Sequence, residues 1–89
     1  MRMQERIEAR LTEALAPARL EIVDESALHA GHSGARAGGE THYRVTLVSA
    51  AFAGRSRVQR HRLVYEALAA EFASGVHALS LDARAPDEA

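Results

Sequence analysis

The sequence predicts a two-layer α+β domain of the order αββαβ, in which two helices cover one face of a three-stranded sheet. Apolar residues recur at three- and four-residue steps in two segments, which is the spacing of amphipathic helices. Three shorter runs are apolar or alternate between apolar and polar residues, which is typical of strands. Because 89 residues allow one domain with one modest core, these elements are expected to pack as helices on a sheet.

The first helix is expected over residues 3–16. Its apolar stripe consists of Met3, Ile7, Leu11, Ala14 and Leu15. The glutamates and arginines of this segment lie off the stripe. Pro17 cannot continue a helix and is therefore expected to end this one.

Two strands are expected next, over residues 20–25 and 42–49. The first is short, with an alternation of apolar and acidic side chains that begins at Leu20. The apolar face of the second consists of Tyr43, Val45 and Leu47. Its polar face consists of His42, Arg44 and Thr46. About sixteen residues connect the two strands, and loops of that length are usually functional or disordered.

The second helix is expected after a break in the pattern at residues 52–54, with Ser56 as its N-cap. It is predicted to extend to about Ala73 and to stop before Gly75. Its apolar arc contains Val58, Val64, Tyr65, Leu68 and Phe72. His61 falls within the same arc and is expected to be hydrogen-bonded and partly buried.

The last strand is expected over residues 76–83, and residues 1–84 are assigned to one domain. The polar residues 85–89 are expected to form a flexible tail. His77 shares its alternation with the leucines that follow it. Its side chain is therefore expected either at the edge of the core or, because it begins the strand, at the surface.

Composition excludes several classes of protein. The chain has no cysteine, so neither a disulfide nor a site built from cysteines alone can form. A formal net charge of −1 gives no overall attraction to nucleic acid. With no signal sequence and no apolar run of about 20 residues, a soluble cytoplasmic protein without a membrane partner is expected. No catalytic motif stands out, and an enzyme is not expected.

A basic stretch at residues 55–62, "RSRVQRHR", is the local exception to this charge balance. Its cations are Arg55, Arg57, Arg60 and Arg62. They do not share one helix face, and the chain has few aromatic residues on which bases could stack. These arginines are candidates for phosphate contacts in a DNA-binding protein, for docking onto an acidic protein, or for simple solvation.

Residues 29–42, "HAGHSGARAGGETH", hold three of the five histidines of the chain. His29 and His32 form an H-x-x-H pair, which alone is a weak zinc motif. Histidines in an exposed glycine-rich loop are most often solvated, so the residues alone make these two only candidates. His42 is a further candidate to supply or support a ligand, but a structural or surface role is favoured for it.

Several stretches together resemble the BolA family, and they occur in the order and spacing of that family over most of the chain. They are "LEIVDES" (20–26), the loop opening at His29, "ETHYRVTLVS" (40–49), "F.G" (52–54), "RHRLVY" (60–65) and "GVHALSL" (75–81). The combination of RHRLVY with the later VHAL is the most specific part. The resemblance implies a small αββαβ domain similar to the type II KH fold.

The resemblance also implies partners. Members of the family bind monothiol glutaredoxins and hold a [2Fe–2S] cluster at the interface, for cluster delivery or iron sensing. The family's ligands correspond here to His77, at the start of the last strand, and to His29 in the loop, with His32 as the alternative to His29. The family is also described as DNA-binding transcriptional regulators active in stress and morphology. That role is the alternative function, carried by the basic stretch.

The implied ligand set agrees with the chemistry of imidazole, which can replace cysteine at the iron of a [2Fe–2S] cluster. A glutaredoxin thiolate and a glutathione thiolate are expected to supply the remaining ligands. The isolated chain is therefore expected to hold no cofactor and to be a monomer or a weak dimer. Because imidazole binds metal only when neutral, binding is expected to weaken as pH falls. The family's C-terminal helix with tryptophan has no counterpart in this sequence, which lacks tryptophan.

Overall fold

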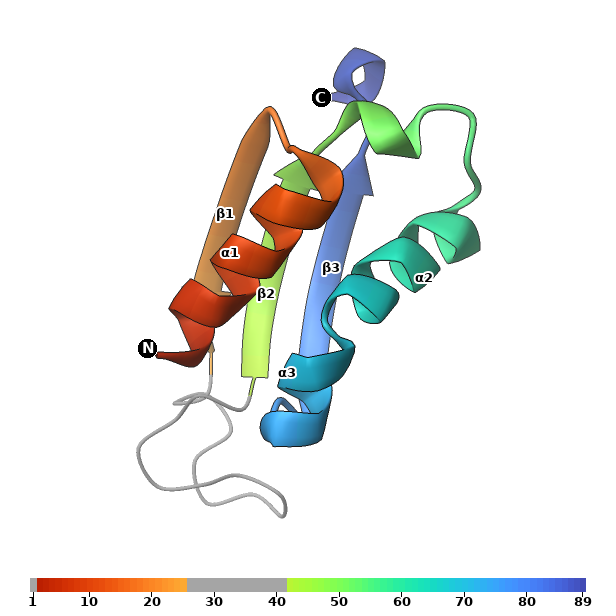
Figure 1. The fold of residues 1–89 in the computed structure, drawn as a ribbon. Coiled ribbons are helices and arrows are strands. Elements are labelled where there is room, and N and C mark those ends of the chain that lie inside the picture. The colour runs from red at the N-terminus through yellow and green to blue at the C-terminus, as the bar shows by residue number, and fades with distance from the viewer. Residues whose placement is uncertain (1, 26–41) are drawn as a thin grey trace.

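The computed structural model describes residues 2–25 and 42–89 and confirms the predicted two-layer α+β fold (Figure 1). The helices are α1 (Met3–Leu15), α2 (Arg57–Ala67) and α3 (Ala69–Ser74). The strands are β1 (Arg19–Asp24), β2 (His42–Val48) and β3 (Ala78–Arg84). Short 3-10 turns, η2 (Ala50–Phe52) and η3 (Pro86–Glu88), follow β2 and β3. No helix in the described ranges has the length and apolarity needed to cross a bilayer.

The strands form one mixed sheet in the order β1-β2-β3, and the helices lie on one of its faces (Figure 1). β1 and β2 are antiparallel, with Leu20 opposite Leu47. β2 and β3 are parallel, with Tyr43 opposite Leu79. A parallel pair needs a crossover connection, which α2 and α3 supply. Side chains alternate between the helix-covered face and the open face along each strand, as the sequence predicts.

The core lies between this sheet and the helices. Its fully buried apolar side chains are Ile7, Leu11, Val45, Leu47, Phe52 and Val64. The predicted stripe of α1 points into it, except that Ala14 is exposed. Helical period and strand alternation thus identify most of the interior, because each buries one face against the other layer.

The end of α1 is fixed by a contact that no periodicity predicts. Ala16 adopts a left-handed conformation, with φ of 42°, and its N–H is bonded to the carbonyl of Thr12. The hydroxyl of Ser49, itself buried, donates to the carbonyl of Leu15 over 2.6 Å and accepts the N–H of Ala51 over 3.1 Å. One side chain therefore satisfies a helix end and starts η2.

The single helix predicted up to Ala73 is wrong, because the structure has two helices that meet at Leu68. Leu68 leaves the helical conformation, with φ of −101° and ψ of 16°, while its side chain is buried. The predicted start is confirmed: the Ser56 hydroxyl accepts the N–H of Gln59, and the Gln59 side chain accepts the N–H of Ser56.

The apolar arc predicted for this region is also partly wrong. Val64 and Leu68 are buried, but Val58 and Tyr65 are 60% and 44% exposed. At 100° per residue, Val58 and Tyr65 lie roughly 100° around the helix from Val64, beyond the arc that contacts the sheet. His61 is half-buried beside Tyr65. The outer face of α2 therefore carries apolar side chains.

A buried carboxylate joins α3 to α1. Glu71 is 1% exposed, and its Oε2 atom lies 3.0 Å from the guanidinium of Arg6. The second oxygen lies 3.5 Å from Nε of Arg10, and Arg6 also donates to the hydroxyl of Ser74. Because a buried carboxylate is costly without a cation, the two arginines of α1 fix the position of α3.

Candidate functional site

His77 lies in the turn between α3 and β3, and its side chain is exposed. Gly75 ends α3 with φ of 136°, in the left-handed region that favours glycine. Val76, which is buried, then anchors the chain immediately before His77. Of the two positions that the sequence allows for this imidazole, the structure shows the surface.

His42, the first residue of β2, is half-buried next to His77. The parallel register pairs His42 with Ala78, the residue after His77. The two imidazole ring centres are 6.2 Å apart, with their planes inclined by 36°. The sequence favoured a structural or surface role for His42 and kept a ligand role open, and its position beside His77 is compatible with either.

β1 ends and β2 begins at this same end of the sheet, on either side of residues 26–41. The N–H of Glu25 donates to the carbonyl of His42 over 2.8 Å, so the two points of attachment are adjacent. Figure 1 shows the end of β1 and the starts of β2 and β3 together at one end of the sheet. His29 and His32, the loop ligands implied by the resemblance, lie outside the described residues. An extended chain from Glu25 covers up to about 14 Å by His29 and about 25 Å by His32.

This end of the sheet, called the histidine end below, offers imidazoles but not a complete metal site. The carboxylate of Glu25 borders the same hollow as His42 and is already paired with Arg44, at 3.2 Å. Within residues 2–25 and 42–89, no group of three or more His, Cys, Asp or Glu side chains could hold a metal ion. Among the described residues, the imidazoles of His42 and His77 are the nitrogen donors at this end.

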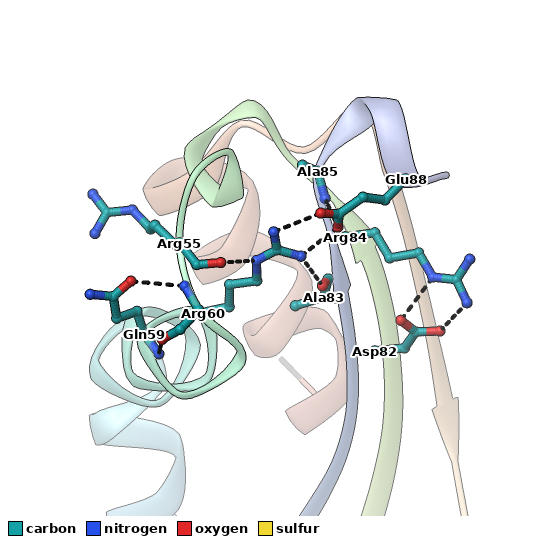
Figure 2. A network of polar contacts seen from close by, with 9 residues as sticks. Arg55, Gln59, Arg60, Asp82, Ala83, Arg84, Ala85 and Glu88 are labelled. Carbon is teal, nitrogen blue, oxygen red and sulfur yellow. Dashed lines mark hydrogen bonds and ion pairs between the residues drawn. The ribbon is translucent and has the colours of Figure 1, made fainter.

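The basic stretch begins α2 at the opposite end of the sheet (Figure 1). Arg60 is not available to a ligand there, because its side chain is only 13% exposed and points inward (Figure 2). Its guanidinium donates to the carbonyls of Arg55 and Ala83, over 3.0 and 3.2 Å, and to the carboxylate of Glu88 over 2.8 Å. Of the four predicted phosphate contacts, Arg60 is thus engaged in holding the fold together.

The other three arginines of the stretch are exposed. Arg55 donates from Nε to the carbonyl of Ala51 over 2.9 Å. Arg57 and Arg62 make none of the hydrogen bonds or ion pairs found among the described residues. A ligand approaching α2 would therefore meet Arg57 and Arg62 first.

The sequence predicts a flexible tail over residues 85–89, whereas the structure holds residues 85–88 against α2 (Figure 2). Ala85 is buried, and its N–H donates to Oε1 of Glu88 over 3.0 Å. The same carboxylate receives two hydrogen bonds from Arg60. Because Arg60 and Glu88 are 28 residues apart, no local pattern could have predicted this contact.

The hydrogen bonds from Arg60 lower the pKa of Glu88 from 4.5 to about 2. A carboxyl group with a lowered pKa stabilises the fold above its ordinary pKa and loses that contribution as pH falls through the lowered value. We therefore expect the η3 turn to remain docked at pH 4 and to be released near pH 2. An NMR titration of the Glu88 side-chain carbon would show its midpoint. A midpoint near 4.5 would contradict the contact, and Arg60→Met should move the midpoint back toward that value.

Known proteins similar to this chain fall in one group. The family model described as "BolA-like protein" matches residues 11–88. BolA-like protein 1 of Mus musculus is 51% identical over 80 residues, which are 90% of this chain and 56% of the mouse protein. The DNA-binding transcriptional regulator BolA of Escherichia coli (strain K12) is 46% identical over 81 residues, which are 91% of this chain and 73% of that protein. The chain thus spans little more than half of the mouse relative.

A solved structure agrees with these relatives. The BolA domain of SufE1 from Arabidopsis thaliana superposes with a TM-score of 0.86 at 47% identity. The match covers 96% of this chain and 93% of that domain. The likeness therefore extends over nearly the whole of both chains.

Proposed function

The chain belongs to the BolA family, and from this premise we propose that it is an adaptor that binds a monothiol glutaredoxin and shares a bridging [2Fe–2S] cluster with it. One observation carries the proposal. His77 is exposed at the same end of the sheet where residues 26–41, with His29 and His32, are attached. Two imidazoles far apart in the sequence can therefore meet at one edge.

The donor set favours a shared centre over a resident one. The chain has no cysteine, and its described part holds no group of three metal-binding side chains. Two imidazoles can occupy two positions on one iron of a [2Fe–2S] cluster, and thiolates of glutaredoxin and glutathione would supply the remaining ligands. The cluster would thus be held only while both proteins are present.

His77 is the fixed ligand in this proposal, and the second ligand is one of three histidines. The resemblance favours His29, with His32 as its alternative. The separation of 6.2 Å between the ring centres of His42 and His77 adds His42, because a turn of the exposed His77 side chain brings the nitrogens closer. His42 is half-buried and more restricted, so we retain the loop histidines as the preferred ligands.

Mixing the chain with a cluster-loaded monothiol glutaredoxin and glutathione tests the proposal. Exchange of thiolate for imidazole at iron changes the electronic environment of the cluster. We expect a changed visible absorption and circular dichroism spectrum and a one-to-one complex in native mass spectrometry. A glutaredoxin spectrum that stays the same at every ratio of the two proteins would refute the adaptor function.

DNA binding is the second candidate function, favoured by one relative and one surface. The Escherichia coli relative is named a DNA-binding transcriptional regulator, and Arg57 and Arg62 are exposed on α2. If both arginines contact phosphates, Arg57→Ala and Arg62→Ala should each weaken DNA binding. Each should also lower, by about 1, the slope with which the logarithm of the binding constant falls against the logarithm of the salt concentration. Electrophoretic mobility shifts at several salt concentrations measure this. Arg60→Ala would not test DNA binding alone, because it also removes the hydrogen bonds from Arg60 to Glu88. Unchanged slopes in both variants would exclude this surface.

A further inference from the structure

The outer face of α2 carries an apolar surface that no other described element covers. Val58 and Tyr65 are 60% and 44% exposed and lie two turns apart on the helix. Together with Ala69 they form the floor of an open hollow of about 690 Å³. Large apolar side chains grouped on one exposed face mark a surface for contact with another molecule.

Tyr65 is the fixed centre of this surface. Its ring and that of Phe72 make an edge contact with centres 5.1 Å apart, and the centre of the His61 imidazole lies 6.4 Å from the Tyr65 ring. An aromatic ring held by two neighbours loses little conformational entropy on binding, and such residues dominate interface energies. The position of the ring is therefore set before any partner arrives.

Charge identifies the occupant. The charged residues that line the hollow are Arg57, Arg62 and Glu66, and the last two lie on the same flank of the helix, one turn apart. When two identical helices pack antiparallel about a twofold axis, the same flank of each faces that of the other. An axis close to Tyr65 then places Arg62 beside Glu66 of the second copy, twice, and Val58 against Ala69 of the second copy. An acidic or a basic partner would instead meet one like charge on this flank.

We propose that this face binds a second copy of the chain, through an antiparallel pair of α2 helices around Tyr65. One helix face is smaller than the roughly 1,200 Å² of total buried area that stable complexes need. The dimer is therefore weak, with a Kd on the order of 10⁻⁴ M. Neither His42 nor His77 lines this hollow.

A charge exchange tests this arrangement by sedimentation velocity or NMR translational diffusion between about 10 μM and 1 mM. Arg62→Glu and Glu66→Arg each place like charges opposite one another, and each is expected to weaken self-association about tenfold or more. A mixture of the two variants restores both ion pairs and should form a heterodimer with the affinity of the wild type. Arg19→Glu, an exposed arginine on β1 that does not line the hollow, is the control and should leave the Kd within about twofold.

Three outcomes would overturn the proposal. One is a wild-type chain that stays monomeric at 1 mM. If that monomeric chain also binds an acidic amphipathic peptide, the face serves a different partner protein. Another is single variants that self-associate as tightly as the wild type. The last is a mixture that does not recover, with each variant shown by circular dichroism to be folded.

Discussion

Replacing His77 by alanine is expected to abolish transfer of the glutaredoxin cluster into the shared form. His77 is the ligand candidate whose position is fixed by the fold, since Val76 is buried before it and Ala78 pairs with His42 after it. Without this imidazole, one iron of the cluster would lack a ligand, and a water molecule in its place would bind the iron more weakly. The visible circular dichroism spectrum after mixing should then remain that of glutaredoxin alone.

The variant is expected to stay folded, because the His77 side chain is exposed and takes no part in the core. Its free energy of unfolding, measured by thermal unfolding, should match that of the wild type within about 0.5 kcal/mol. His61→Ala is the matched control, since His61 lies on α2 away from this edge. A His77→Ala chain that still changes the cluster spectrum would refute the proposed ligand and, with it, the geometric basis of the adaptor function.

The second ligand can be identified by the same measurement. We compare His29→Ala, His32→Ala and His42→Ala in separate chains. If the change in the cluster spectrum is lost in only one variant, the histidine replaced in that variant is the second ligand, because the other histidines do not take its place. Partial loss in both His29→Ala and His32→Ala would indicate that the two exchange. A loss confined to His42→Ala would mean that both ligands, His42 and His77, lie at the edge of the sheet.

Much of the fold and part of this site could be predicted from the sequence, because both depend on short periods. The alternation of apolar and polar residues around Val45 predicts which face of β2 is buried, and the apolar stripe around Ile7 predicts which face of α1 is buried. The strand after His77 follows from the same reasoning, although it begins at Ala78 and not at residue 76. The resemblance then adds what periodicity cannot, namely the chemistry that a histidine at this place would serve.

The features that were not predicted depend on tertiary contacts. The break at Leu68 has neither glycine nor proline to announce it. The Arg60–Glu88 contact joins residues 28 apart, so a polar tail and a basic stretch each looked solvated alone. His42 was noted as a possible ligand, and the sequence could have favoured it more: it begins a strand, His77 immediately precedes another, and a parallel pairing of those strands brings the two histidines together.

Phe52→Ala is expected to be among the most destabilising single substitutions in the chain. The sequence "FAG" at residues 52–54 reads as a break between elements, yet Phe52 is fully buried. Its N–H donates to the carbonyl of Ser49 over 3.1 Å, and its ring belongs to the hydrophobic core. Truncating a buried phenylalanine costs about 3–5 kcal/mol, from lost apolar burial and from the cavity left behind.

That loss is large relative to the whole stability of a domain of this size. At about 0.05–0.15 kcal/mol per residue, a chain of 89 residues has roughly 4–13 kcal/mol in total. The melting temperature should fall by at least about 12 °C, and a considerable fraction of the chains could be unfolded at 37 °C. Urea unfolding followed by far-ultraviolet circular dichroism measures the change in free energy.

Two comparisons separate the packing of Phe52 from a general sensitivity of this region. Phe52→Leu keeps most of the apolar volume and should cost less than half as much as the alanine variant. Val58→Ala removes an apolar side chain that is 60% exposed, and should change the free energy of unfolding by no more than about 0.5 kcal/mol. If Phe52→Ala costs less than about 1 kcal/mol, the ring does not fill the core as the structure shows. In that case the turn at η2 is only a connection, as the sequence alone suggests.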